Sequence, residues 1–358
     1  MPNNATTADK ALAREQRWLN AWYGKRRWTL LLLPVMWLFI LLAALRRGWL
    51  KRYQQKTLAT PVVVVGNISV GGTGKTPLLM TLVAYLQEQG FTPGVISRGY
   101  GGNAPAYPYL LDAQSTAAEA GDEPLTIFLR TGCAVCVGSD RVASARRLED
   151  AGCDILLSDD GLQHYKLGRT LEIAVVDGQR GVGNGFRLPV GPLRESVQRL
   201  KQVDWVLVNT PAADFSLLGL SDLFWMPMEI KALELVSLVT GAAYPLADFA
   251  GKTVNAVAGI GNPERFYQSL RLAQLNPIAH SFADHYAFTP KDLAYGDEFA
   301  LVMTEKDAVK CRPFAQPHWY YLAITAELPA SFYQALSAKL DKYAQSQVSF
   351  LTKTSFRK

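Results

Sequence analysis

The chain has 358 residues, which is enough for about two domains of ordinary size. Hydrophobic residues make up 49% of it and charged residues 19%, so each domain can bury a sizeable core. The formal net charge is +6, but much of this excess flanks one apolar segment, and no basic tract interleaved with aromatic residues follows it. These features favour a membrane surface as partner and argue against nucleic acid.

The first predicted element is an apolar run over residues 28–45, which a basic segment over 1–27 precedes. As a helix, its 18 uncharged residues would measure roughly 27 Å, just short of a bilayer core of about 30 Å. Tryptophans along the run and basic residues at both ends are typical of a membrane interface. We therefore expect a membrane-associated helix, and charge on both flanks leaves open whether it spans the bilayer. The flanking basic residues are Arg14, Arg17, Lys25, Arg26, Arg27, Arg46, Arg47, Lys51 and Arg52.

Strands and helices alternate over residues 55–240. Residues 61–66 form a continuous apolar strand of the kind that is buried on both faces of a parallel sheet, and a helix is predicted over 75–89. Further strands are predicted at 94–97, 134–138, 154–157, 172–176 and 205–208, with a helix at 141–151. This alternation predicts a doubly wound α/β core.

A loop-rich passage at 241–251 indicates a boundary, and a second alternation follows over 250–345. It contains predicted strands at 253–258, 300–304 and 319–324, and predicted helices at 263–272 and 329–344. The predicted fold class is therefore α/β: a P-loop NTPase-like doubly wound core, a second, smaller α/β domain and an N-terminal membrane helix.

Cys133 and Cys136 form a C-x-x-C pair, which is found in redox pairs and in halves of zinc sites. The surrounding residues 133–138 are predicted as a strand, in which residues three apart point to opposite faces. No second C-x-x-C or paired histidines complete a metal set in the sequence. We interpret both cysteines as core residues of a protein in a reducing, cytoplasmic compartment.

A glycine-rich loop lies between the strand predicted at 61–66 and the helix predicted at 75–89. The residues that fit a Walker A loop are Ser69, Val70, Gly71, Gly72, Thr73, Gly74, Lys75 and Thr76. Glycines let backbone N–H groups turn toward phosphate oxygens, Lys75 can reach the β- and γ-phosphates, and the Thr76 hydroxyl can bind Mg²⁺. Ser69 departs from the motif, which has glycine there. The loop predicts binding of a nucleoside triphosphate with Mg²⁺.

A Walker B element is an apolar strand that ends in a carboxylate able to hold Mg²⁺ or its water. The segment that ends in Asp159 and Asp160 fits this description, although adjacent aspartates also cap turns. Asp177, at the end of the next strand, is a competitor for the metal role. The segment 304–307 misses the guanine motif [NT]-K-x-D by one residue, which favours ATP over GTP.

A phosphoryl acceptor hydroxyl benefits from a positioned base, and a γ-phosphate benefits from cationic groups. The sequence offers candidates for both roles without bringing them together in space. They are Asp122, Glu123, Arg141, Arg194, Glu195 and His285.

Taken together, these fragments closely resemble the tetraacyldisaccharide 4′-kinase family, the lipid A pathway kinases of Gram-negative inner membranes. The motifs that carry the resemblance are GNISVGGTGKTP (66–77), SRGYGG (97–102), GDEP (121–124), SDDGLQH (158–164), GNG (183–185), LPVGPLRE (188–195), FADH (282–285) and TEKD (304–307). The resemblance covers nearly the whole chain from about residue 30, and the family also has an N-terminal hydrophobic helix.

The resemblance implies transfer of the ATP γ-phosphate to the 4′-hydroxyl of a tetraacyldisaccharide 1-phosphate, giving lipid IVA. It implies an enzyme of the bacterial inner membrane with its catalytic domains on the cytoplasmic side, a lipid substrate and no obligate protein partner. Asp122 would be the catalytic base, paired with His285, while Lys75 and Thr76 would hold the phosphates and Mg²⁺. Metal and water would be organised by Asp159, Asp160 and Glu195, and charge would be neutralised by Arg141 and Arg194.

The alternative is a membrane-attached P-loop GTPase switch or metallochaperone, which shares the glycine loop and the doubly wound sheet. A GTPase would require a guanine motif, and metal delivery would require a His/Cys cluster. The sequence contains neither feature.

Overall fold

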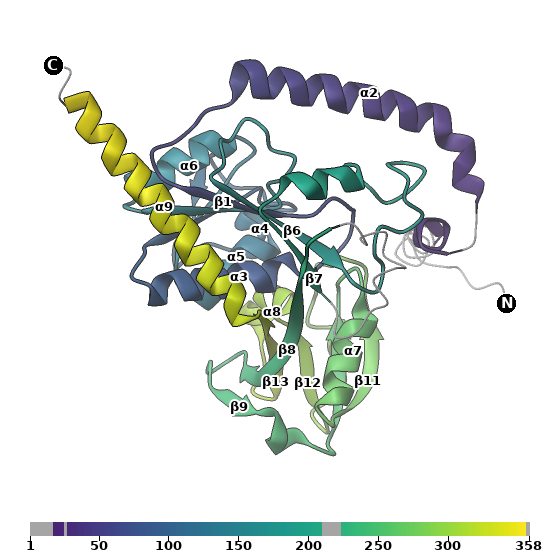
Figure 1. The fold of residues 1–358 in the computed structure, drawn as a ribbon. Helices are drawn as coiled ribbons and strands as arrows, with labels where there is room; N and C mark the ends of the chain where they lie inside the picture. The colour runs from purple at the N-terminus through teal and green to yellow at the C-terminus, as the bar shows by residue number, and fades with distance from the viewer. Residues whose placement is uncertain (1–16, 25–26, 210–222, 356–358) are drawn as a thin grey trace.

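A computed structural model describes residues 17–24, 27–209 and 223–355 of the chain (Figure 1). Most of the predicted basic segment, including Arg14, Lys25 and Arg26, lies outside these residues. The strands are β1 (Val62–Gly66), β2 (Pro93–Ser97), β3 (Tyr109–Leu110), β4 (Ala134–Val137), β5 (Ile155–Asp159), β6 (Leu171–Asp177), β7 (Trp205–Asn209), β8 (Met226–Ser237), β9 (Ala243–Pro245), β10 (Thr253–Ala258), β11 (Asn276–Ser281), β12 (Ala300–Thr304) and β13 (Trp319–Glu327). The α-helices are α2 (Leu33–Trp49), α3 (Lys75–Glu88), α4 (Ala117–Ala120), α5 (Asp122–Thr131), α6 (Arg141–Asp150), α7 (Pro263–Leu272), α8 (Glu305–Cys311) and α9 (Ala330–Ser355).

The first half of the described chain is a doubly wound α/β layer, as predicted. Its strands β7, β6, β1, β5, β2 and β4 lie side by side in that order, and every neighbouring pair is parallel. The central strand β1 is buried along its whole length. Its alternate valines enter two separate apolar clusters, one with α3 and α5 and the other with α6, so helices cover both faces. The cysteines at 133 and 136 are buried and unpaired in this core, as expected.

Strand β8 joins the two halves into one sheet. It begins by pairing in parallel with β7, and further along it pairs antiparallel with β13 and β9. The other strands of the second half, β11, β10, β12 and β13, are parallel to one another. The sequence patterns missed β8 and β11, because β11 is largely exposed, β8 mixes buried and exposed positions, and neither strand has a continuous apolar run.

The last helix, α9, returns from the second half to the first. Its residues Phe332, Leu336 and Leu340 are buried in the same apolar cluster as α3 and β7. The rings of Phe332 and Trp205 lie edge to face, with centroids 5.3 Å apart. Figure 1 shows α9 crossing the core diagonally. The C-terminal end of the chain therefore completes the core of the first half.

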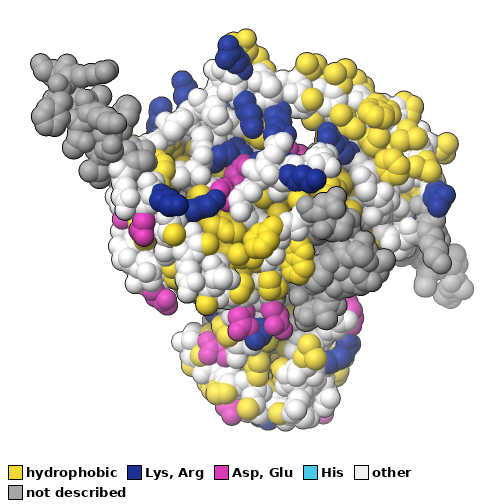
Figure 2. Space-filling view, in the orientation of Figure 1, with side chains coloured by type: hydrophobic (Ala, Val, Ile, Leu, Met, Phe, Trp, Pro, Cys, Tyr) yellow, Lys and Arg dark blue, Asp and Glu magenta, His cyan; other side chains and the backbone are white. Residues whose placement is uncertain are grey.

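The predicted membrane helix is confirmed as a helix and is longer than 28–45. A 3-10 turn over Trp28–Leu32 leads into α2, and a π-helical turn over Leu50–Gln54 continues it. The whole segment Trp28–Gln54 has 27 residues, is largely exposed, and is long and apolar enough to cross a membrane. Pro34 lies in the first turn of α2, where no helical hydrogen bond is lost. The helix arches over the core, and apolar side chains cover much of its visible surface (Figures 1 and 2).

Candidate active site

A cleft of about 2570 Å³ lies between the arch of α2, the carboxyl ends of the core strands and loops of the second half. The P-loop and the ends of β2 and β5 line its floor. Apolar side chains of α2, among them Phe39 and Leu42, line the wall beneath the arch, and the second half contributes Asp284, His285 and Lys306. In a doubly wound sheet, ligands bind outside the carboxyl ends of the strands, which is where this cleft opens.

The glycine loop connects β1 to α3, as predicted. Gly74 has a φ of +93° immediately before the helix, and a Cβ there would lie 2.7 Å from Asn209 Nδ2. That amide also donates a hydrogen bond to the Thr73 carbonyl at 3.0 Å, so the end of β7 supports the loop. Ser69 forms an extended bridge with Leu193 and is not among the residues with positive φ. The substitution at the motif's first glycine is therefore compatible with the local backbone.

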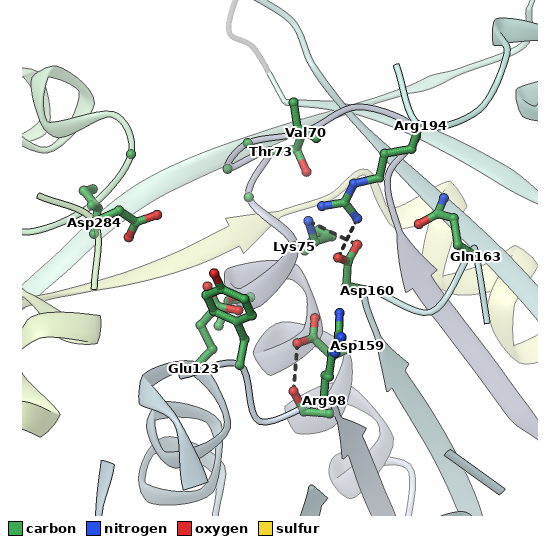
Figure 3. Close-up of a pocket in the computed structure, with 18 of the residues that line it drawn as sticks. Val70, Thr73, Lys75, Arg98, Glu123, Asp159, Asp160, Gln163, Arg194 and Asp284 are labelled. Atoms are coloured by element: carbon green, nitrogen blue, oxygen red, sulfur yellow. Dashed lines mark hydrogen bonds and ion pairs between the residues drawn. The ribbon is translucent and has the colours of Figure 1, made fainter. Parts of the chain in front are cut away.

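Asp160 lies between two cationic side chains at the floor of the cleft (Figure 3). Lys75 Nζ is 3.5 Å from Asp160 Oδ1, and Arg194 Nη1 donates to Asp160 Oδ2 at 2.7 Å. Burial alone would raise the pKa of Asp160, but Lys75 and Arg194 lower it to about 2. The carboxylate is therefore ionised at neutral pH and holds both cations near the P-loop.

Asp159, the last residue of β5, is buried below Asp160. Ser97 donates to its Oδ2 at 3.3 Å, whereas its Oδ1 is buried without a hydrogen-bond partner among the described residues. Burial raises the pKa of Asp159 to about 6, and the nearby charges of Glu123 and Asp160 contribute to the rise. A buried carboxylate with an unused oxygen at the end of the central sheet suits a divalent cation, which would neutralise it.

The arginine predicted at 141 lies in a different environment from Arg194. Arg141 is buried, and it donates to the backbone carbonyls of Ile96 at 2.7 Å and Asp159 at 3.0 Å. It therefore links the ends of β2 and β5 directly beneath the carboxylates. Its charge is close to the phosphate site, although its N–H groups at both terminal nitrogens already serve the backbone.

Glu195 is bound by three side chains from two other segments. Gln163 donates to its Oε1 at 2.9 Å, and Tyr165 donates to its Oε2 at 2.6 Å. Arg47, at the end of α2, lies 3.5 Å from the same Oε2 and also packs over the Tyr165 ring. Glu195 thus connects α2 to the segment that carries Arg194.

The structure brings Asp122 and His285 together. Asp122 begins α5, and His285 follows β11 in the second half, at a φ of +59°. Their Oδ2 and Nδ1 atoms are 3.1 Å apart, and Lys310 Nζ lies 3.7 Å from the same Oδ2. Burial would raise the pKa of Asp122, but the hydrogen bond from His285 and the charge of Lys310 lower it overall. Asp122 is therefore an ionised carboxylate at neutral pH.

Sequence reasoning missed three charged or polar residues of this region: Asn209, Lys306 and Lys310. Asn209 ends β7, a position that a strand prediction alone does not mark as functional. Both lysines lie on α8, and the motif TEKD at its start indicates no role for either of them. Asp177, the competitor for the metal role, accepts a 2.7 Å hydrogen bond from Arg265 and others from the backbone of residues 179 and 180. All three of these bonds fall on its Oδ1.

A doubly wound sheet with a P-loop, paired with an aspartate–histidine couple across one cleft, defines a P-loop phosphotransferase. The chain belongs to the family described as Tetraacyldisaccharide-1-P 4′-kinase, whose sequence profile matches residues 28–341.

Relatives of the same description come from several bacteria. The chain is 47% identical over 323 residues to the tetraacyldisaccharide 4′-kinase of Stenotrophomonas maltophilia, covering 86% of this chain and 94% of the relative. It is 48% identical over 332 residues to that of Aeromonas salmonicida, covering 89% and 95%. Among solved structures, "apo" form LpxK from Aquifex aeolicus in complex with ATP has the same fold, with a TM-score of 0.72 and 23% identity over 88% of this chain and 99% of that one. The resemblance inferred from the motifs is confirmed, and the GTPase alternative is not favoured.

Proposed function

We propose that this chain transfers the γ-phosphate of ATP to the 4′-hydroxyl of a tetraacyldisaccharide 1-phosphate and so forms lipid IVA. The observation that carries the proposal is that the P-loop, His285 and an apolar wall of α2 line the same cleft. The P-loop would bind the triphosphate, His285 would orient the general base Asp122, and the apolar wall would contact the acyl chains. Family membership and the ATP complex of the Aquifex aeolicus protein support the same donor and acceptor.

Nucleotide binding is assigned to the loop from Ser69 to Thr76. Backbone N–H groups of the loop and the start of α3 would surround the phosphate oxygens. Lys75, which Asp160 holds at 3.5 Å, would meet the β- and γ-phosphates, and Arg194 would add positive charge near the transferring group. Arg141 contributes charge from below and keeps the ends of β2 and β5 in place.

The donor set at the P-loop fits Mg²⁺. Thr76 stands in the first turn of α3, and the buried Oδ1 of Asp159 has no partner among the described residues. Among residues 17–24, 27–209 and 223–355, no three His, Cys, Asp or Glu side chains gather as a metal cage. This suits Mg²⁺, which commonly uses one or two protein oxygens plus substrate phosphates and water. When bound, Mg²⁺ would neutralise charge on the phosphates; Asp160 and Glu195 remain candidates for holding its water.

Asp122 is assigned as the general base. The contacts with His285 and Lys310 both fall on Oδ2, so we assign the acceptor hydroxyl to Oδ1. Asp122 takes the hydroxyl proton as the oxygen–phosphorus bond forms, and the bond to the bridging oxygen breaks to leave ADP. His285 belongs to the second half, so catalysis depends on how the two halves meet. We accordingly propose that residues 55–240 bind the nucleotide and that 250–345 complete the base.

The acceptor is proposed to arrive from the cytoplasmic surface of the bacterial inner membrane. Exposed side chains of α2, including Leu38, Leu41 and Trp37, would enter the bilayer while the basic residues at its C-terminal end face lipid head groups. The lipid then needs only to slide under the helix to reach the P-loop. No protein partner is required for this route.

The test is a lipid phosphorylation assay with purified protein, labelled ATP and tetraacyldisaccharide 1-phosphate in mixed micelles. Label in the lipid, with the 4′-position identified by mass spectrometry, supports the proposal. The Asp122→Ala protein is the matched control for a contaminating kinase. Unlabelled lipid together with protein-stimulated GTP hydrolysis would instead favour a switch.

A further inference from the structure

Lys306, the second residue of α8, contacts three acceptors from two other segments. Its Nζ lies 3.2 Å from Glu123 Oε1 on α5, 3.2 Å from Asp284 Oδ1 and 3.3 Å from His285 Nε2. A lysine ammonium group has three donors and no acceptor. Each donor of Lys306 therefore has one partner, and the side chain ties α5 to the loop after β11. Glu123 and Asp284 approach from different parts of the fold in Figure 3.

The ammonium group of Lys306 is charged at neutral pH. Burial alone would lower the pKa of Lys306, but the carboxylates of Glu123 and Asp284 raise it overall. A permanently charged donor leaves a neighbouring ring nitrogen only one role, that of acceptor.

The contact with Lys306 determines which nitrogen of His285 carries the proton. Nε2 lies 3.3 Å from the ammonium group and farther, 3.9 Å, from the Asp284 carboxylate. Because the ammonium group is the nearer partner, Nε2 presents its lone pair, and a neutral imidazole then carries its proton on Nδ1. Nδ1 is the atom that lies 3.1 Å from Asp122 Oδ2, and an N–H group there donates to the carboxylate. A proton on Nε2 as well would oppose two positive charges at 3.3 Å. The two contacts are therefore compatible with a single tautomer.

We propose that Lys306 is a positioning residue that holds His285 in the neutral Nδ1–H tautomer. In this state the imidazole orients Asp122 through Oδ2 and takes no proton from it, so the proton of the acceptor hydroxyl stays on Asp122 until product leaves. The catalytic consequence rests on the proposed function, whereas the tautomer does not.

The tautomer is measured directly on full-length protein labelled with ¹⁵N-histidine, by long-range ¹H–¹⁵N correlation at pH 7.5. The chain has 4 histidines, and the signal missing from His285→Gln identifies His285. We expect a protonated Nδ1 and an unprotonated Nε2 in the wild type and in Lys306→Arg, which keeps a charged donor. Lys306→Met should admit the Nε2–H tautomer. A wild-type His285 that carries its proton on Nε2, or on both nitrogens, overturns the inference.

Kinetics provide the second measurement. Lys306→Met should lower kcat at least about tenfold, the low side of a general-base contribution, while the KM for ATP changes less than about threefold. Lys306→Arg should recover much of the loss, and Lys291→Met, at an exposed lysine of the same half, should match the wild type. A wild-type kcat in Lys306→Met refutes the positioning role.

The two readouts separate this inference from the proposed function. If Lys306→Met does not fold, the spectra of the wild type and Lys306→Arg still decide the tautomer. An Nδ1–H tautomer in a protein that phosphorylates no lipid refutes the function and leaves the tautomer assignment standing. Active enzyme with an Nε2–H tautomer refutes only the inference.

Discussion

Asp122 Oδ2 and His285 Nδ1 lie 3.1 Å apart although 163 positions separate the two residues in the chain. The aspartate begins a helix of the half that carries the glycine loop, and the histidine lies in a loop of the other half. A base at this position is therefore assembled by the tertiary fold, and each residue can be tested separately.

Asp122→Ala should lower kcat by about 10²–10⁴-fold, because it removes the proposed proton acceptor. His285→Ala should lower kcat less, since the carboxylate remains but loses its orienting donor. ATP affinity, measured by titration calorimetry, should stay within about threefold of wild type in both, because neither residue belongs to the P-loop. His318→Ala is the control histidine. Near-normal turnover of Asp122→Ala would remove the base assignment.

Gly74→Ala should abolish most ATP binding. The new methyl group would lie 2.7 Å from Asn209 Nδ2 at a φ of +93°, so either this amide gives up its hydrogen bond to the Thr73 carbonyl or the loop itself shifts, and both outcomes disturb the loop. Gly90→Ala is a matched control, because Gly90 also has a positive φ, +84°, but open space around its Cβ position. Both changes should cost about 1–2 kcal/mol of stability from the backbone conformation alone. Equal ATP affinity in the two variants would show that the glycine loop tolerates a side chain at position 74.

The position of the glycine loop between β1 and α3 was predictable from sequence because it is local. A strand, a glycine loop and a helix adjoin in the chain, and their residue types alone indicate a phosphate cradle. The neighbourhood of Asp122 was not predictable from residue patterns, and only the family resemblance paired it with His285. Lys306 was missed because its three acceptors become neighbours only when β11 and β12 pair with β10 and when α8 packs against α5. Exposed strands such as β11 were missed because burial, which creates the apolar signal, is absent there.

Asp159→Asn should raise the Mg²⁺ concentration needed for half-maximal activity by about tenfold or more, because it weakens a buried oxygen with no protein partner. Glu195→Gln should change it much less, since the Glu195 oxygens already accept from Gln163 and Tyr165. Activity is titrated with Mg²⁺ at constant ATP. The reverse order of effects would make Glu195 the direct ligand.

Leu38→Glu combined with Leu41→Glu should reduce binding to anionic vesicles at least tenfold in a flotation assay. Each leucine is 56% exposed on α2, and burying such a side chain contributes about 1.5–3 kcal/mol. Val239→Glu, at a residue that is 53% exposed in the second half, is the control. Unchanged flotation of the double variant would exclude this face as the membrane contact.

Glu305→Gln should flatten the dependence of stability on pH. Burial raises the pKa of Glu305 to about 7 from 4.5, against the opposing charges of Arg130 and Arg312. The folded protein therefore binds an extra proton between these values, so its free energy of unfolding falls as the pH rises through this window. Thermal unfolding at pH 5 and pH 7.5 in one detergent should show a smaller decrease in Tm for the variant. Glu298→Gln, at an exposed position, should behave as wild type, and an equal slope for Glu305→Gln would contradict the assignment.

The return of α9 to the first half has a consequence for synthesis of the chain. Phe332, Leu336 and Leu340 complete the core around α3 and β7, so the first half cannot finish folding until nearly the whole chain has left the ribosome. The helix over Trp28–Gln54 emerges long before then and is free to meet the bilayer during translation. During synthesis, the apolar helix therefore emerges first, and the core of the first half is completed last. A premature stop codon before residue 332 would leave the P-loop translated but its supporting core open.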